Sequence, residues 1–220
     1  MKLTNNLFFY PEQGMFDCNT YVITGSPGII IDPGNTSFLS GLVGNLKRDG
    51  IDPKDIGIIV NTHLHGDHCA ANEAFKELSG ASIAIHPVQK KNYQMVVVDG
   101  ARIFGMPPME FKEDYSLDGS RLNAGDTELE MIPAPGHTPD SICFYNRREK
   151  TLVCGDVLFA MNTGRVDLPG GNGEALKKSI EALSELDIEY LLPGHMDIVP
   201  GVEKVAQNFD FIRSRVLPWL

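Results

Sequence analysis

Residues 62–68 read Thr62-His63-Leu64-His65-Gly66-Asp67-His68 and directly follow an apolar run at residues 56–60. Three imidazoles and one carboxylate fall within six consecutive residues of this stretch. Histidine nitrogens and carboxylate oxygens are the ligands of zinc and related divalent metal ions. Crowding such groups into one tight turn costs free energy unless a cation or solvent satisfies them. We therefore expect a metal site at this loop, and a surrounding scaffold that places the loop and supplies further ligands.

The composition is that of an ordinary globular protein. The chain has 220 residues, of which 42% are hydrophobic and 22% are charged, and this predicts a single domain over residues 1–220. It contains no run of 18 apolar residues, so we expect no membrane-spanning helix. Residues 1–6 lack the basic patch and apolar core of a secretory signal, which makes the cytoplasm the expected location.

Charge and cysteine content narrow the expected partners. The net charge is −10, without a block of lysine or arginine, which argues against a nucleic-acid partner and leaves a small-molecule substrate as the expectation. The four cysteines form no Cys-x-x-Cys pair, so we expect them to be reduced and buried; they are Cys18, Cys69, Cys143 and Cys154. Cys69 follows His68 directly, and a place near the metal is the alternative for it.

Turn residues and apolar spacing divide the chain into short strands and amphipathic helices. Strands are predicted at residues 7–10, 18–24, 29–32, 56–60, 82–86, 129–133, 141–145, 151–154 and 189–192. Helices are predicted at residues 37–49, 69–78, 174–186 and 202–216. Strands with intervening helices in both halves suggest two β-sheets with helices outside, a four-layer αββα sandwich of the α/β class.

Residues 87–128 are the least regular part of the pattern. A segment of this length between clear elements is either a functional loop or lid, or a packing or dimer surface. Within it, residues 94–109 are apolar but interrupted, and they are the candidate surface for a homodimer.

Three more potential ligands follow glycines at the ends of predicted strands. His137 and His195 each follow a Pro-Gly pair, and Asp156 follows Gly155. A glycine at a strand end lets the backbone turn sharply and leaves the next side chain over the sheet edge, where functional residues gather. The chain thus offers seven ligands, which are too many for one tetrahedral zinc and suit two ions. His63 and His65 can face one ion and Asp67 and His68 its neighbour, with Asp156 as the natural bridge.

The H-x-H-x-D-H loop, the two Pro-Gly-His turns and the Gly-Asp turn resemble the metallo-β-lactamase superfamily, which has the αββα fold. Residues 32–34, Asp-Pro-Gly, match the same superfamily, where the aspartate lies beneath the metal loop. The resemblance implies one ion bound by His63, His65 and His137, a second bound by Asp67, His68 and His195, and Asp156 between the two.

Residues 163–171, Thr-Gly-Arg-Val-Asp-Leu-Pro-Gly-Gly, are similar to a segment of the glyoxalase II-like (hydroxyacylglutathione hydrolase) branch. In this segment Arg165 could hold Asp156 or Asp167 in place, or form an ordinary surface pair with Asp167. Class B β-lactamases have a cysteine where this chain has Asp156, which argues against lactamase activity. Flavodiiron proteins have a glutamate where it has His65, and they carry a flavin domain that this sequence lacks. Only 25 residues follow His195, so the chain resembles a short form of the branch, and a glutathione moiety in the substrate is not implied.

The expected activity is metal-dependent hydrolysis of a thioester. A hydroxide bridging two divalent ions would attack the carbonyl, with Asp67 and Asp156 as the catalytic carboxylates. Zinc is the expected metal, and the same ligands also suit iron or manganese. The alternatives are a mononuclear-iron persulfide dioxygenase, a lactonase or other ester hydrolase, and a non-catalytic binding module on the same fold. The residues that bind the substrate are not identified by the sequence.

Overall fold

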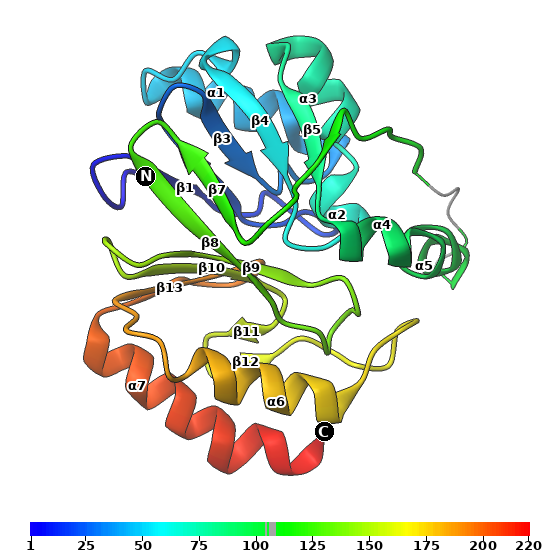
Figure 1. Cartoon of the computed structure of the whole chain (residues 1–220), viewed down its shortest axis with the longest axis vertical. Helices are drawn as coiled ribbons and strands as arrows, with labels where there is room; N and C mark the ends of the chain where they lie inside the picture. Colours follow the sequence, from blue (N-terminus) through cyan, green and yellow to red (C-terminus); the bar gives the residue numbers. More distant parts are fainter. Residues whose placement is uncertain (104, 106–108) are drawn as a thin grey trace.

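Two six-stranded mixed β-sheets pack face to face in the computed structural model, which describes residues 1–103, 105 and 109–220 (Figure 1). The first sheet follows the order β1 (Leu7–Tyr10), β2 (Thr20–Ile23), β3 (Gly28–Ile31), β4 (Ile56–Val60), β5 (Ser82–Ile85) and β6 (Tyr115–Ser116). The second follows β14 (Val199–Pro200), β13 (Tyr190–Pro193), β10 (Thr151–Gly155), β9 (Ile142–Asn146), β8 (Thr127–Pro133) and β7 (Arg121–Ala124). A two-stranded ribbon, β11 (Leu158–Phe159) and β12 (Asn162–Thr163), completes the strands of the described residues.

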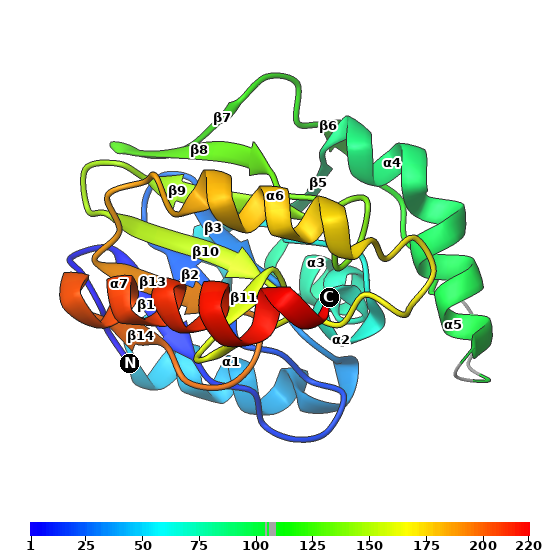
Figure 2. The ribbon, with the colours of Figure 1, turned by 90° about the horizontal axis from the view of Figure 1, so that it is seen from below.

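Helices cover the outer faces of both sheets, so the predicted four-layer αββα sandwich is confirmed (Figures 1 and 2). Around the first sheet lie η1 (Thr36–Phe38), α1 (Leu39–Arg48), η2 (Pro53–Asp55), α2 (Gly66–Cys69) and α3 (Asn72–Ser79). Around the second lie α6 (Gly173–Leu183), α7 (Val202–Phe211), η4 (Ile212–Val216) and η5 (Leu217–Trp219). Throughout the described ranges, every helix is too short or too polar to cross a bilayer.

Strand alternation explains how each sheet is buried on both faces. Ile29 and Ile31 of β3 point between the sheets, where they join a cluster that includes Phe144 of β9. Ile30 points the other way and packs with Leu46 of α1 under the outer helices. Successive side chains of a strand face opposite sides, so a strand covered on both faces becomes an uninterrupted apolar run.

The strand directions bring the functional turns to one edge. β3 runs parallel to β4, and β10 runs parallel to β13. β8 is antiparallel to β9, which is antiparallel to β10, so β8 and β10 run in the same direction. The loops after β8, β10 and β13 therefore leave the second sheet at the same edge, and each carries one predicted ligand. The loop after β4 in the first sheet carries the other four.

The predicted irregularity of residues 87–128 is wrong for its first part. Residues 87–103 form a helical run made of α4 (Pro87–Tyr93), η3 (Gln94–Asp99) and α5 (Gly100–Ile103). His86 caps the run by accepting from the Val88 N–H, and Gln89 accepts from the His86 N–H in return, which is a capping box before a helix with proline in its first turn. Residues 104 and 106–108 of the candidate dimer surface lie outside the described residues.

The predicted helix at residues 69–78 is also wrong in its bounds. The structure has two helices there, α2 and α3, with Ala70 and Ala71 between them. The Ala71 N–H donates to the carbonyl of Gly34, outside the helix, at 2.9 Å, so the run of intrahelical bonds is interrupted at this point. Because α2 begins at Gly66, Asp67 and His68 belong to a helical turn and do not precede one.

Gly136 shows how closely α6 packs on the turn after β8. Its φ is +155°, and a Cβ at this position would lie 2.3 Å from the Cα of Leu176. We expect Gly136→Ala to lower the free energy of unfolding by about 2–4 kcal/mol, through backbone strain and overpacking. Gly44→Ala is the control, because Gly44 lies in α1 with open space around it and alanine favours a helix. Urea unfolding of both variants measures the difference, and a Gly136→Ala protein as stable as the wild type would contradict the close contact.

Candidate metal centre

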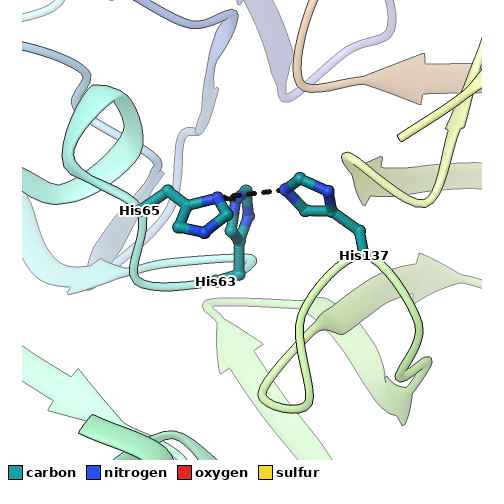
Figure 3. Close-up of side chains that lie close together, drawn as sticks. All are labelled: His63, His65 and His137. Carbon is teal, nitrogen blue, oxygen red and sulfur yellow. Dashed lines mark hydrogen bonds between the residues drawn. The ribbon is translucent and has the colours of Figure 1, made fainter. Parts of the chain in front are cut away.

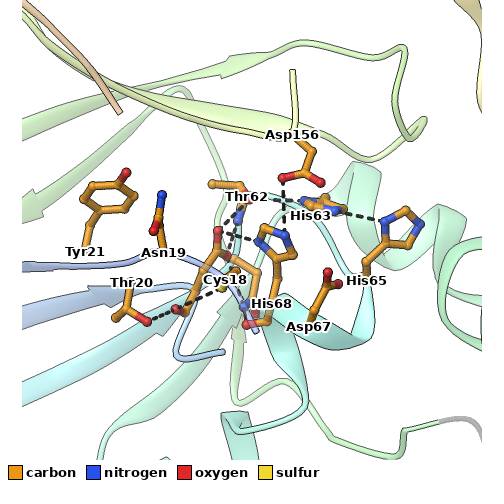
Figure 4. A network of polar contacts seen from close by, with 12 residues as sticks. Cys18, Asn19, Thr20, Tyr21, Thr62, His63, His65, Asp67, His68 and Asp156 are labelled. Atoms are coloured by element: carbon orange, nitrogen blue, oxygen red, sulfur yellow. Dashed lines mark hydrogen bonds and ion pairs between the residues drawn. The ribbon is translucent and has the colours of Figure 1, made fainter. Parts of the chain in front are cut away.

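The seven predicted ligands come together at the edge shared by the two sheets. Figure 3 shows His63, His65 and His137, and Figure 4 adds Asp67, His68 and Asp156. They fall into three overlapping groups whose ligand atoms lie within 4.8 Å of one another: His63, His65 and His137; Asp67, His68 and His195; and His63, His68 and Asp156. Side chains from both halves of the chain are present in each of the first two groups. All four cysteines have free, buried thiols, and none belongs to these groups of described residues.

The first histidine group, His63, His65 and His137, presents three ring nitrogens to one point (Figure 3). The Nδ1 atom of His65 lies 3.1 Å from Nε2 of His63 and 3.0 Å from Nε2 of His137. Each neutral imidazole has one nitrogen lone pair, so three converging nitrogens cannot all be satisfied by bonding to one another. Three nitrogen ligands with an open fourth position are typical of a zinc-like cation.

The second group, Asp67, His68 and His195, lies beside the first. Nε2 of His195 is 3.3 Å from Nε2 of His68 and 3.4 Å from Oδ2 of Asp67. His68 is fully buried, whereas Asp67 and His195 are partly exposed. The second group thus adds one carboxylate to two imidazoles and faces the accessible side of the site.

Asp156 lies between the two groups. Its Oδ1 is 3.4 Å from Nε2 of His68 (Figure 4). Its Oδ2 is 3.5 Å from Nε2 of His137 and 3.5 Å from Nε2 of His195. Oδ1 is buried and has no hydrogen-bond partner among the described residues. An orphaned carboxylate oxygen in a cluster of imidazoles fits a site for divalent cations, because a cation would satisfy the oxygen and the ring nitrogens together.

Asp32 fixes the metal loop from below. It follows β3 with a φ of +55°, a left-handed conformation that aspartate tolerates better than bulkier residues do. Its carboxylate accepts hydrogen bonds from the Thr62 N–H at 2.8 Å and the Thr62 hydroxyl at 2.7 Å. Its Oδ2 also lies 3.0 Å from Nδ1 of His68, which leaves Nε2 of that ring directed at the ligand cluster.

The glycine of the second Pro-Gly-His turn is required by close contacts. A Cβ on Gly194 would lie 2.3 Å from Oδ1 of Asp156 and 2.7 Å from Cε1 of His68. No side chain fits there without displacing a ligand of the cluster, which explains why glycine precedes His195.

Arg165 touches the site through its backbone. Its carbonyl lies 2.7 Å from Nδ1 of His137 and can accept that proton. Its guanidinium pairs with Asp167 at 2.6 and 2.7 Å, in an exposed position. Of the two carboxylates that the sequence suggested for Arg165, the side chain therefore holds Asp167 and not Asp156.

Burial and charge set the protonation states of the cluster. Burial and the neighbouring imidazoles lower the pKa of His63 well below its ordinary value and that of His65 to about 4. Burial disfavours the ionised form of Asp156, but His68 and His195 outweigh it and hold the pKa of this carboxyl well below its usual range. Burial likewise opposes the charge on His195, whose pKa is nevertheless raised to about 10 by hydrogen bonds to Asp156 and Asp67. His63 and His65 therefore offer neutral imidazoles at neutral pH, the form that binds metal.

Two carboxylates near the site were not singled out from the sequence. Glu12 lies 2.8 Å from Nδ1 of His195, and Asp140 accepts from the Leu64 N–H at 3.1 Å. Asp140 stands three residues after His137, and that proximity is a signal in the sequence that could have drawn attention to it. Glu12 has no comparable signal, because it lies in the turn after the first strand, 183 residues from its partner.

A family model described as the metallo-beta-lactamase superfamily matches residues 14–195. This chain belongs to the metallo-β-lactamase superfamily. Two similar proteins are a probable metallo-hydrolase, MJ0888, of Methanocaldococcus jannaschii and a hydroxyacylglutathione hydrolase of Francisella tularensis subsp. novicida. The first is 36% identical, over 83% of this chain and 89% of the relative. The second is 29% identical, over 87% of this chain and 69% of the relative.

Solved structures agree with the metallo-β-lactamase fold. The B3 metallo-β-lactamase BLEG-1 superposes with a TM-score of 0.77 at 27% identity, covering 91% of this chain and 96% of that one. The protein TTHA1623, solved in a di-iron-bound form, superposes with a TM-score of 0.72 at 25% identity, covering 96% of this chain and 100% of that one. The superfamily suggests a metal-dependent hydrolase, and the residues that could hold the metal are the groups described above.

Asp140 makes the free energy of unfolding depend on pH in a way that can be tested. Burial raises the pKa of its carboxyl from 3.8 to about 6, and its Oδ1 is buried without a hydrogen-bond partner in the described part of the chain. A carboxyl with a raised pKa stabilises the fold fully below its unfolded pKa and loses that contribution as the pH rises through the folded value. Between about pH 3 and about pH 7, the wild type should therefore lose about 3 kcal/mol relative to Asp140→Asn, which cannot ionise.

Urea unfolding of the wild type and Asp140→Asn across this pH range, with a chelator in every sample, measures the difference. Changes shared by both proteins cancel, so parallel pH profiles would contradict the raised pKa of Asp140.

Proposed function

We propose that this chain is a dinuclear metal-dependent hydrolase of thioesters. The observation that carries the proposal is the position of Asp156, whose Oδ2 lies 3.5 Å from a ligand nitrogen of each histidine group. A carboxylate placed in this way suits a bridge between two cations, and two adjacent sites are typical of metallo-hydrolases.

The proposed ligands follow the two groups. His63, His65 and His137 would hold one ion, and Asp67, His68 and His195 would hold the other, with Asp156 shared. Two divalent ions at these positions would supply an activated water and polarise the carbonyl of the substrate. Zinc is the proposed metal, because the donor set of imidazoles and carboxylates matches its preferences. Iron and manganese are the alternative metals, because the same donor set suits them. Iron has the further support that TTHA1623 was solved in a di-iron-bound form.

The residues of the chain have separate tasks in the proposed reaction. Asp67 is partly exposed at the mouth of the site, where its carboxylate can accept a hydrogen bond from the attacking water and orient it. Asp32 and the Arg165 carbonyl hold the rings of His68 and His137 by their Nδ1 atoms. These contacts keep both Nε2 atoms aimed at the cluster. Because the two ions would activate a water as the nucleophile, no nucleophilic side chain is needed.

Two observations support a thioester as the substrate class. The similarity to a hydroxyacylglutathione hydrolase covers 87% of this chain. In addition, the segment at residues 163–171 lies against the site: a Cβ on Gly164 would be 1.9 Å from the Asp156 carbonyl oxygen and 3.0 Å from Cγ of His137. The part of the sequence that resembles the glyoxalase II-like branch therefore packs directly on two of the proposed ligands.

The substrate class can be tested with a panel. Purified wild-type protein is assayed against a short acyl thioester of glutathione, a second thioester without glutathione, a lactone, a β-lactam and glutathione persulfide with oxygen uptake. We expect hydrolysis of at least one thioester and no oxygen consumption. Oxygen uptake on the persulfide would favour the dioxygenase, and turnover confined to the lactone or the β-lactam would contradict the thioester assignment.

The bridging role is tested by Asp156→Ala. Loss of an outer contact to a metal ligand usually costs about 10–100-fold in metal affinity or activity, and loss of a shared ligand should cost more. We therefore expect the variant to bind fewer than two ions and to lose more than about 100-fold in thioester hydrolysis. Asp210→Ala, at an exposed aspartate on α7, is the control and should resemble the wild type. Full activity in Asp156→Ala would contradict the assignment.

A further inference from the structure

Glu12 makes a two-point contact with the turn that carries His195. Its Oε2 lies 2.8 Å from Nδ1 of His195, and its Oε1 accepts a hydrogen bond from the Met196 N–H at 3.2 Å. Both oxygens of one carboxylate are therefore used on two consecutive residues of the turn after β13. The contact joins positions that are 183 residues apart, since Glu12 lies between β1 and β2.

The position of Glu12 is itself held by buried groups. Its backbone N–H donates to Oδ1 of Asn19 at 3.1 Å, and Asn19 is fully buried. The Nδ2 of Asn19 donates to the carbonyls of Pro193 at 3.0 Å and Met196 at 2.9 Å. The Glu12 backbone and the turn at residues 193–196 are thus fixed to the same asparagine, which makes the carboxylate part of a defined frame.

The Nδ1 partners of the histidines differ between the two groups. In the second group, His68 faces the Asp32 carboxylate and His195 faces the Glu12 carboxylate. In the first group, His137 faces a neutral backbone carbonyl and Nδ1 of His63 lies 3.2 Å from the Thr62 hydroxyl. A carboxylate behind an imidazole selects the tautomer with a free Nε2 and makes that nitrogen a better electron donor.

We propose that Glu12 is a positioning residue for the second group: it holds His195 with Nε2 toward Asp67 and Asp156, and its negative charge strengthens the binding of a divalent cation there relative to the first group. The inference rests on the proposed dinuclear site. It assigns a function to a side chain outside the seven ligands, and it predicts that the two ions are bound unequally.

An ordinary surface ion pair is the competing explanation. Glu12 is about one-third exposed, and exposed pairs usually contribute little. Such a pair would be lost without consequence for metal binding. The two explanations therefore differ in the affinity of one ion, which can be measured without any assay of activity.

The test uses Glu12→Gln and Glu12→Ala in the full chain, loaded with zinc. Glutamine keeps an oxygen that can accept from Nδ1 but removes the charge, and alanine removes both. The measurements are zinc ions per chain after dialysis and the affinity of each ion by competition with a chromophoric chelator. We expect the ion of the second group to bind about 10–100-fold more weakly in Glu12→Gln, and to lose at least as much affinity in Glu12→Ala. The affinity of the ion of the first group should be unchanged in both variants. Glu203→Gln, on α7 away from the site, is the control.

A second readout reports on the His195 ring directly. In nitrogen-15 spectra of the zinc-loaded protein, the ring of His195 should show a protonated Nδ1 in the wild type. The same pattern should persist in Glu12→Gln and be lost or broadened in Glu12→Ala. These spectra distinguish a displaced ring from a general loss of stability, which thermal unfolding of the metal-free variants also monitors.

The outcomes separate this inference from the proposed function. Two ions bound with wild-type affinities in Glu12→Gln and Glu12→Ala would overturn the role of Glu12 and leave the dinuclear hydrolase intact. A wild-type protein that binds fewer than two ions would overturn the dinuclear site itself, and the role of Glu12 with it. An equal weakening of both ions would contradict the predicted difference between the groups.

Discussion

The carboxylate of Asp156 lies within 3.5 Å of ring nitrogens from both histidine groups, and the rest of the site is arranged around this position. Asp156 follows the end of β10 in the second sheet, whereas His63 and His68, which are grouped with it, come from the loop after β4 in the first sheet. The fold must therefore fix the positions of the two sheets relative to each other at their shared edge to within a fraction of an ångström. The fully buried residues between the sheets, among them Tyr21 and Phe144, provide that rigidity.

Polar contacts extend this rigidity to the ligands. The hydroxyl of Tyr21 donates to the Pro193 carbonyl at 2.7 Å. A side chain of the core between the sheets is thereby bonded to the turn that carries His195. Asp32 ties the metal loop to the end of β3 through Thr62 and His68. Outer contacts of this kind fix ring orientation, and a ligand cluster without them would lose much of its affinity for metal. Both halves of the chain thus contribute to the scaffold and to the site.

Much of this arrangement could be predicted from the sequence, because the ligands follow strands whose apolar runs and glycine turns are strong local signals. The ligand loop, both Pro-Gly-His turns and the αββα layers belong to this class. The helical run at residues 87–103 was not predicted, because His86 and Pro87 are a strand end in the sequence but a capping box in the structure. Glu12 could not be predicted, because its partner is brought to it only by tertiary contacts such as those of Asn19 and Tyr21 with the Pro193 carbonyl.

The most direct test of the dinuclear site is the metal content of the wild-type protein purified without added metal, with thioester hydrolysis measured on the same sample. Elemental analysis should find two divalent ions per chain. Hydrolysis should stop when a chelator removes them and return when they are restored. A single iron per chain with oxygen consumption, or hydrolysis that continues after complete removal of metal, would contradict the account.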